Sequence, residues 1–389
     1  MTSQHLTGEP RLAFWMLLLG NLLIGTGVML PAGMLLDLAH SFDVSEARAA
    51  KLILTSGLVV GIGAPLLAAL TNAVDRRVLL AGSLALYAVG HAASAMVTDF
   101  NLMIALRALT VVGAAIFTPQ AAATVGSMVV PERRAAVIAF IFIGWSVASV
   151  AGMPLAAYIS AKAGWQTPYI LMAGLCALGT VGIWLSMPGG IRVPHIAASS
   201  WFRALSTPSI LSVLAVTALA LSGQFSVFSY FAPIMANGFG ASPEAFVLVL
   251  VAMGIAGITG NMLAARLVLP LGIDRTVFVS LAVLFGGVGL FTLGFGVLAI
   301  GAVGACIWSL GTFATVSLQQ SRVVARAPEL ASATVALNTS VVYLGQATGT
   351  YAGGLVVAQG IGPGSGLLSL AFLAAAVAMS VLAARLGRA

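Results

Sequence analysis

Long apolar runs, separated by short polar or charged breaks, follow one another along almost the whole of this 389-residue chain. A helix that crosses a bilayer needs about 20 consecutive, mainly apolar residues, and these runs reach that length. They predict a first set of spans at 12–36, 50–71, 78–97, 101–126, 135–159 and 166–187. A second set follows at 208–235, 243–267, 276–297, 299–321, 331–357 and 364–386. We therefore expect an all-α integral membrane protein with 12 transmembrane helices.

The composition supports a membrane location and excludes most other classes of protein. Hydrophobic residues make up 60% of the chain and charged residues only 7%, whereas soluble domains carry about 25% charged residues. No nucleotide-binding or metalloprotease motif occurs, and the four histidines have no metal-ligand spacing. Cys176 and Cys306 lie inside apolar runs, which argues against a disulfide framework or a thiolate metal site. We expect no enzymatic activity, no metal and no cofactor.

The positive charges predict how the chain is oriented in the membrane. There are 17 Lys and Arg residues against 10 Asp and Glu, a net charge of +7. The cations lie scattered at the ends of apolar runs, so no nucleic-acid partner is expected. With both termini cytoplasmic, 13 of the 17 face the cytoplasm, while Arg48, Lys51 and Lys162 lie outside and Arg107 lies within a span. Cytoplasmic loops are enriched in Lys and Arg, so this orientation is the expected one.

Several residues in the first set of spans and their connections recur in the second set at a fixed offset of 197 residues. The offset relates Gly63 to Gly260, Pro131-Glu132 to Pro328-Glu329, and Gly152 to Gly349. Between the sets, 188–207 is the only long polar stretch. We divide the chain into an N-terminal six-helix bundle at 1–187, a cytoplasmic linker at 188–207 and a C-terminal six-helix bundle at 208–389. Two pseudo-symmetric six-helix bundles are typical of transporters whose halves rock about a central site.

Six short motifs, in the same order along the chain, resemble those of the major facilitator superfamily. They are Gly63–Thr71 followed by Asp75-Arg76-Arg77; Arg107 with Gly113; Pro131–Arg134; Gly144, Gly152 and Pro154 with Gly164-Trp165; Phe228–Tyr230 with Pro233; and Asn338–Gly354. Over nearly its whole length the chain is similar to the drug/proton antiporter group, and especially to bacterial arabinose-efflux-type permeases. The resemblance implies a monomer that exports sugars or drugs across the bacterial cytoplasmic (inner) membrane.

The signature between the second and third spans implies a gate. It holds Gly63, Asp75, Arg76 and Arg77, and we expect its charges to cap helix ends and to pair across the cytoplasmic mouth. The alternative is that these positive charges only orient the chain in the membrane and form no gate. The sequence departs from the family pattern at Asn72-Ala73, where an Asp and an Arg are usual. Asp75 would therefore have to supply the acidic member of the network.

The fifth span resembles the motif associated with antiporters. Gly144, Gly152 and Pro154 place small or kink-prone residues along this helix, which suits close packing against the other half of the protein. Ordinary helix packing, with no bearing on antiport, is the alternative. A second departure concerns the first span, where related permeases tend to carry an acidic residue and this chain has Val28.

Polar and aromatic residues inside the spans are the candidates for substrate binding, because polar groups in a membrane should face the bundle interior or a watery cavity. Amides and aromatic rings rank above hydroxyls, which can bond back to their own helix. The candidates are Arg107, Gln224, Tyr230, Asn338, Trp145, Gln346, Trp308 and Asn21. Such a site is neutral to mildly positive. It favours a sugar, a nucleoside or an uncharged drug over a lipophilic cation.

Proton coupling requires a group that titrates as access alternates, and the carboxylates are poorly placed for it. No Asp or Glu lies at the membrane midplane: nine of the ten map to the cytoplasmic or the outer side of the membrane, and only Asp37 lies near the end of a span. Asp37 is the carboxylate candidate, with Arg107 as its possible partner and exposure to the outer water as the alternative. His91, in the outer half of the third span, is the second candidate, against a structural, hydrogen-bonded histidine.

Three functions remain open. The first is a secondary active transporter that exports a small organic solute by alternating access, in exchange for protons. The second is an uncoupled facilitator of the same fold, which the absence of acidic residues at Val28 and Asn72 favours. The third is a transporter-like sensor. In each of them the partners are a small molecule and the lipid bilayer.

Overall fold

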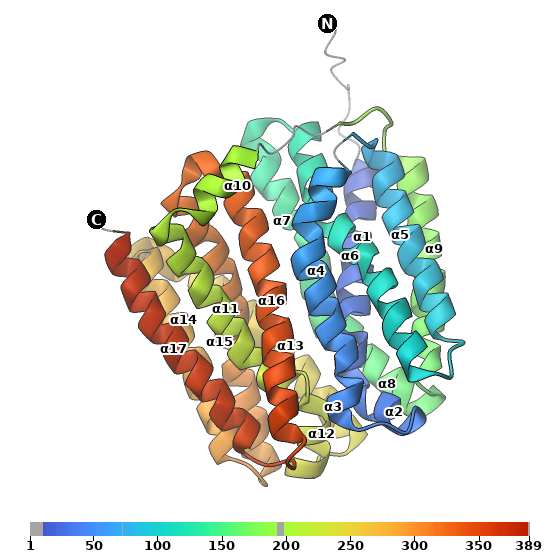
Figure 1. Cartoon of the computed structure of the whole chain (residues 1–389), viewed down its shortest axis with the longest axis vertical. Coiled ribbons are helices and arrows are strands. Elements are labelled where there is room, and N and C mark those ends of the chain that lie inside the picture. The colour runs from blue at the N-terminus through green and yellow to red at the C-terminus, as the bar shows by residue number, and fades with distance from the viewer. Residues whose placement is uncertain (1–10, 72, 193–197, 388–389) are drawn as a thin grey trace, which may run out of the picture.

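The computed structural model describes residues 11–71, 73–192 and 198–387, and all regular structure in these ranges is helical. The first part contains α1 (Arg11–Gly33), α2 (Leu35–Ser41), α3 (Glu46–Ala49), α4 (Lys51–Leu70), α5 (Arg76–Ser94), α6 (Phe100–Met128), α7 (Pro131–Val147), η1 (Ala148–Gly152), α8 (Met153–Ala163) and α9 (Gln166–Ser186). The short helix α10 (Ala198–Leu205) follows at the same end of the molecule as the start of α1 (Figure 1).

The second part contains α11 (Pro208–Phe228), α12 (Phe231–Pro233), η2 (Ile234–Gly238), α13 (Pro243–Leu271), α14 (Ile273–Leu293), α15 (Leu298–Arg326), η3 (Pro328–Leu330), α16 (Ala331–Val357) and α17 (Gly364–Leu386). Helix α17 ends at the same end of the molecule at which α1 begins, and we call this end the terminal face (Figure 1). The opposite end, where α2, α3 and α12 lie, is the far face.

Ten helical segments in the described residues are long and apolar enough to cross a membrane. Helices α5 and α16 are also long but carry more polar residues, among them Arg76 and His91 on α5 and Asn338 and Gln346 on α16. The structure thus confirms the predicted all-α membrane fold and is consistent with twelve spans. Helix ends agree with the predicted spans to within about five residues.

Three predicted spans are interrupted, which the apolar pattern does not reveal. In the first span, helix α1 ends at Gly33, and the chain passes through Met34 into α2. The fifth contains the π turn η1 just before Pro154, which has no N–H to donate to the helix. The seventh passes from α11 through α12 into the π turn η2. In all three, the segment beyond the interruption lies toward the far face.

Glycines allow the helices of each half to approach closely. A Cβ on Gly152 would lie 2.1 Å from Thr26 Oγ1 on α1, and a Cβ on Gly349 would lie 2.2 Å from the Ser222 carbonyl on α11. Because Gly152 and Gly349 are related by the 197-residue offset, each half uses the same position to pack its fifth span on its first. The division of the chain at 188–207 remains a prediction, since residues 193–197 lie outside the described ranges.

Helices α4 and α16 form the main seam between the halves, and they run side by side in Figure 1. A Cβ on Gly57 would lie 2.7 Å from the Tyr343 carbonyl, and one on Gly61 would lie 2.9 Å from the Leu344 side chain. On the other side of the molecule, Gly254 of α13 packs against Val150 in η1. The far face adds contacts of α2 with α12 and of α3 with α16.

We expect Gly349→Ala to destabilise the folded protein because its methyl group has no room beside the Ser222 carbonyl. Overpacking of this kind costs about 1–3 kcal/mol, so the Tm of the purified protein in detergent should fall by several degrees. Gly286→Ala is the matched control, since nothing lies within 4 Å of its added methyl group. An unchanged Tm in Gly349→Ala would contradict the close packing.

Candidate functional site

In the N-terminal half, three of the polar residues form a hydrogen-bonded chain near the middle of the membrane-spanning helices. The Asn21 amide donates to the Ile141 carbonyl at 3.2 Å and accepts from Thr118 Oγ1 at 3.0 Å. Trp145 Nε1 donates to the same Thr118 oxygen at 3.4 Å. The Trp145 ring rests on Gly25 and is half-buried. Asn21 is thus a positioning group, while the fixed indole presents a ring on which a ligand can stack.

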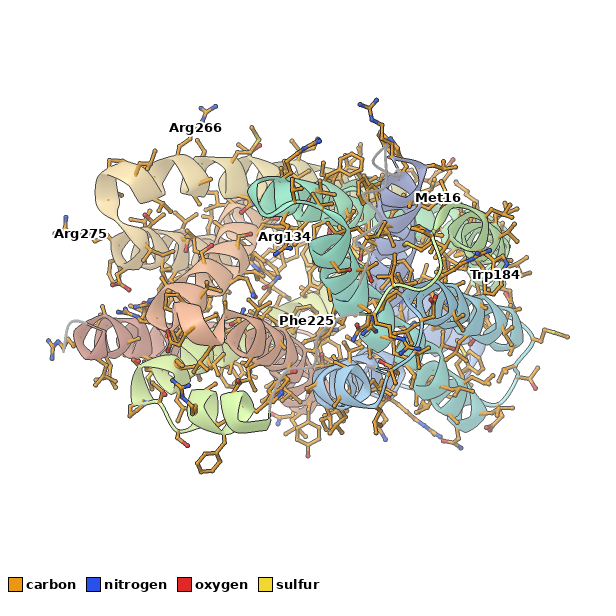
Figure 2. All side chains as sticks on the ribbon, turned by 90° about the horizontal axis from the view of Figure 1, so that it is seen from above. Met16, Arg134, Trp184, Phe225, Arg266 and Arg275 are labelled. Carbon is orange, nitrogen blue, oxygen red and sulfur yellow. The ribbon has the colours of Figure 1, made fainter. Side chains whose placement is uncertain are left out.

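In the C-terminal half, two candidate amides are free. Within the described part of the chain, the side chains of Gln224 on α11 and Gln346 on α16 have no hydrogen-bond partner. Gln224 is half-buried and Gln346 is 6% exposed. Helices α11 and α16 pack together, and the neighbouring Phe225 lies near the middle of the molecule when it is viewed from the terminal face (Figure 2). An amide in this position needs a partner, and a ligand can provide one.

The other C-terminal candidates are occupied by contacts within their own half. The Tyr230 hydroxyl donates to the Thr350 carbonyl at 2.8 Å. Asn338 accepts from Thr217 at 2.9 Å and donates to Gln320 at 2.8 Å. Trp308 is fully buried, with ring centroids of Phe228, Phe231 and Phe291 at 6.2, 5.9 and 5.9 Å, although its Nε1 has no hydrogen-bond partner among the described residues. In this conformation these three residues stabilise the C-terminal half rather than face a ligand.

Arg107 is 1% exposed and is held by neutral groups. Its Nε donates to Ser56 Oγ at 2.8 Å, Nη1 donates to the Gly27 carbonyl at 2.9 Å, and Nη2 donates to the Val28 carbonyl at 2.8 Å. The expected pairing with Asp37 is therefore wrong. Asp37 instead accepts a hydrogen bond from Ser160 at the far face.

The partners of Arg107 follow from Pro31 inside α1. A helical N–H at this position would bond to the Gly27 carbonyl, but proline has none, so that carbonyl is left free. An unpaired carbonyl in a membrane-spanning helix is costly, and the guanidinium satisfies it. The sequence shows Pro31, which predicts a carbonyl without a helical donor. It does not show that Arg107 is the residue that donates to this carbonyl.

His91 is completely buried beside Arg107. Its Nδ1 lies 2.8 Å from the Tyr87 carbonyl, so this nitrogen carries the proton and donates. Its Nε2 has no partner among the described residues. The rings of Tyr87 and Tyr169 lie 4.4 and 5.6 Å from the imidazole, centroid to centroid. The unused lone pair on Nε2 is the buried position in this half that could accept a proton.

The charges of the gate signature find partners in the N-terminal half and at the start of the linker. Asp75 caps α5 by accepting from the Arg77 N–H at 2.9 Å, and it also accepts from the Gly190 N–H. The Arg76 N–H donates to the Ile191 carbonyl at 3.1 Å, and the Arg77 guanidinium lies 4.5 Å from the Trp184 ring. These contacts cap a helix as expected, but they do not reach across the terminal face to the other half.

The small residues of two motifs also pack differently from expectation. Gly144 approaches the backbone of α1, where an added Cβ would lie 2.3 Å from the Leu18 carbonyl, and Gly152 packs on Thr26 of the same helix. For both glycines the atoms nearest to an added Cβ belong to α1, whereas it is Val150 in η1 that packs against Gly254 of the other half. Pro154 lies in the first turn of α8 beyond η1. A Cβ on Gly63 would make only ordinary contacts, the nearest at 3.5 Å, so the close seam depends on Gly57 and Gly61 instead.

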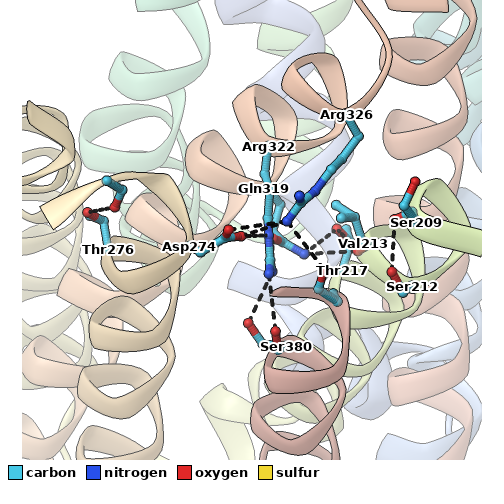
Figure 3. A network of polar contacts seen from close by, with 12 residues as sticks. Ser209, Ser212, Val213, Thr217, Asp274, Thr276, Gln319, Arg322, Arg326 and Ser380 are labelled. Atoms are coloured by element: carbon cyan, nitrogen blue, oxygen red, sulfur yellow. Dashed lines mark hydrogen bonds and ion pairs between the residues drawn. The ribbon is translucent and has the colours of Figure 1, made fainter. Parts of the chain in front are cut away.

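A polar network in the C-terminal half was not among the sequence candidates (Figure 3). Asp274 at the start of α14 accepts from Arg322 Nε at 2.7 Å and from Arg326 Nη2 at 2.9 Å. Arg322 also reaches Ser380 on α17 at 3.1 Å, and Gln319 donates to the Val213 carbonyl on α11 at 2.9 Å. The network joins four helices. In the sequence, the indication of this network is the 3.6-residue spacing of the polar positions on α15.

The site has little negative charge. The carboxylates with described side chains lie at helix ends or in connections: Asp37, Asp43, Glu46, Asp75, Asp99, Glu244, Asp274 and Glu329. No group of three or more His, Cys, Asp or Glu side chains in the described residues could hold a metal ion. The middle of the molecule therefore offers amides, hydroxyls, aromatic rings and one buried cation, Arg107, that is hydrogen-bonded by neutral groups.

Comparison with known proteins agrees with this fold. The model of the Major Facilitator Superfamily matches residues 17–350. The inner membrane transport protein YdhP of Escherichia coli K12 is 29% identical over 350 residues, 89% of each chain. A probable sugar efflux transporter of Helicobacter pylori is 24% identical over 366 residues, 91% of this chain and 92% of that one.

Among solved structures, a bacterial homologue of the human lysosomal transporter Spinster, inward-facing and unoccupied, superposes with a TM-score of 0.77. The two chains are 15% identical, and the match covers 99% of this chain and 98% of that one. At this identity the likeness concerns the fold alone.

We expect Arg107→Lys to destabilise the protein although it keeps the charge. A lysine ammonium cannot reach Ser56, Gly27 and Val28 in the geometry of the guanidinium fork, and buried hydrogen bonds to a charged group are worth about 1.5–3 kcal/mol each. The Tm should fall by several degrees. Arg48→Lys, at an exposed arginine of the far face, should leave the Tm unchanged. Equal Tm values for the two variants would contradict the assigned role of Arg107.

Proposed function

The chain belongs to the major facilitator superfamily of membrane transporters, and from that premise we propose that it exports a small, uncharged organic solute by alternating access. The proposed transport runs across the bacterial cytoplasmic membrane, in exchange for protons. The solute class is a sugar, a nucleoside or an uncharged drug. No catalytic step is involved.

The free amides of Gln224 and Gln346 carry this proposal. Together with the half-buried indole of Trp145 in the other half, they offer hydrogen bonds and a ring face within the membrane-spanning helices, while the described carboxylates lie at helix ends or in connections. A polyhydroxylated or heteroaromatic solute matches such groups. The probable sugar efflux transporter among the relatives supports the same class of substrate.

The contacts between the halves support alternating access. Lys162 on α8 pairs with Glu244 on α13 at 3.2 Å, and a Cβ on Gly354 would lie 3.9 Å from Ala47, so the halves meet at the far face. The excess of Lys and Arg at the terminal face favours a cytoplasmic location for that end and for both termini. In this orientation the far-face contacts close the protein to the outside. We propose 1–187 and 208–389 as the rocking units of a monomer, joined by 188–207.

Proton exchange is assigned to His91 in preference to Asp37. A coupling group must change its access between the two sides of the membrane. Asp37 lines a pocket that is open at the far face even though the halves are in contact there, whereas His91 is enclosed and its Nε2 is free. An uncoupled facilitator is the second candidate, and the location of the described carboxylate side chains at helix ends or in connections favours it.

The substrate site is tested by ligand-induced thermal stabilisation of the purified protein, using a panel of neutral sugars, nucleosides and uncharged antibiotics, and a permanently cationic dye. We expect a neutral compound to raise the Tm. Gln224→Ala and Gln346→Ala should each raise its Kd about three- to tenfold, because each removes one hydrogen bond of about 0.5–1.5 kcal/mol.

Gln359→Ala is the matched control, since Gln359 is exposed at the far face and should leave the Kd unchanged. Stabilisation by the cationic dye that Gln224→Ala or Gln346→Ala abolishes would contradict the neutral site. If Gln224→Ala and Gln346→Ala bind the compound with the same Kd as Gln359→Ala, the assignment of the two amides is contradicted.

Coupling is tested by solute uptake into everted membrane vesicles with an acidic lumen. An exchanger should accumulate solute in the lumen as protons leave it. His91→Asn keeps a donor to the Tyr87 carbonyl but has no nitrogen that titrates, so it should lose the response to the pH gradient and retain downhill exchange. Uptake by the unmodified protein that ignores the gradient would instead identify a facilitator.

A further inference from the structure

A pocket of about 440 Å³ opens at the far face of the N-terminal half, away from the central amides. This volume lies within the range of small-molecule sites. Its walls come from α2, from the connection between α5 and α6, and from the end of α8 with the connection to α9. The lining residues used below are Asp37, Phe42, Ser160 and Trp165.

The carboxylate of Asp37 lacks a counter-ion. One of its oxygens accepts the Ser160 hydroxyl, and the Ser160 residue is only 3% exposed. In the described residues the other oxygen has no hydrogen-bond partner, and no Lys or Arg nitrogen lies within 4.0 Å of the group. By contrast, Glu244 pairs with Lys162 at 3.2 Å, and Asp274 pairs with Arg322 at 2.7 Å. A carboxylate that lines a pocket with a free oxygen is suited to bind a cation.

Aromatic rings form the second part of the pocket. The centroids of Phe42 and Trp165 lie 5.1 Å apart with the planes tilted by 45°, so the two rings meet at an angle rather than stacking face to face. Both residues line the pocket. Ring faces attract ammonium groups, and aromatic rings beside a carboxylate are a common means of binding quaternary ammonium ions.

The surrounding charge favours a cation as well. The far face carries five carboxylates, Asp37, Asp43, Glu46, Asp99 and Glu244, against three cations, Arg48, Lys51 and Lys162. Lys162 is paired with Glu244, and the Arg48 guanidinium donates to Asn101 and lies 5.6 Å from the Phe100 ring. This face is therefore net negative in a chain whose net charge is +7.

We propose that this pocket is an accessory site for a small organic ammonium ion, bound by the Asp37 carboxylate and the faces of Phe42 and Trp165. None of the central candidates Gln224, Gln346 and Trp145 lines this pocket, and the proposal does not depend on which solute is exported. Because α2 contacts α12 and α8 contacts α13 in the other half, an occupant also lies next to segments that close the far face.

The test is equilibrium binding of radiolabelled choline to the purified protein in detergent at pH 8. We expect saturable binding that the uncharged choline isostere dimethylbutanol does not displace. Asp37→Asn retains an oxygen for Ser160 but loses the charge, and it should weaken choline binding at least tenfold. Phe42→Leu keeps the charge and removes one ring face, and it should weaken binding about two- to fivefold.

Asp43→Asn is the matched control. Asp43 has a φ of 49°, a conformation that Asn also tolerates, and it does not line the pocket. It should leave choline binding unchanged, as should Gln224→Ala and Gln346→Ala, which alter only the central site. Tm values confirm that each variant is folded. Absence of binding, equal displacement by dimethylbutanol, or full binding by Asp37→Asn would overturn the proposal.

Discussion

The bilayer core supplies no water, so every polar group within it must find its partner inside the protein. Arg107 shows how far this constraint reaches. Pro31 leaves the Gly27 carbonyl without a donor, and Arg107 supplies one from another helix, while Ser56 on a third helix accepts from Nε. The Arg107 guanidinium thereby connects α1, α4 and α6, and its buried charge is hydrogen-bonded by neutral oxygens without a carboxylate.

The apolar surroundings of the bilayer also explain why glycines determine how the helices pack. Lipid tails are as apolar as leucine, so helices associate through close contact of their surfaces rather than through burial from water. Gly152 and Gly349 bring the fifth span of each half onto its first, and Gly57 brings α4 onto α16 of the other half. The helix α1 ends at Gly33, and η1 ends at Gly152 itself. Beyond these points, α2 and α8 meet the C-terminal half. Close packing and segmented far-face helices suit rocking of two rigid halves.

The distribution of charge separates the molecule into regions with different chemistry. Carboxylates and most cations lie at the two faces, where water can solvate them, and the middle is left with amides, hydroxyls and rings. Gln224 and Gln346 are available to a neutral solute there. The far face is net negative, and its pocket around Asp37 offers a free carboxylate oxygen beside two rings. The proposed transport site and the proposed accessory site therefore select solutes of different charge.

The sequence by itself determined the all-α membrane fold, the approximate ends of the spans, the family resemblance and the lack of carboxylates in the middle of the spans. Each depends on a local rule, since a span needs about 20 apolar residues and a buried charge is costly wherever it lies. The tertiary structure decided which polar residues are free. Tyr230, Asn338 and Trp308 have the same local signals as Gln224 and Gln346, yet neighbouring helices enclose the first three. Helical periodicity identifies the face on which a side chain lies, but only the packing of the helices determines what covers that face.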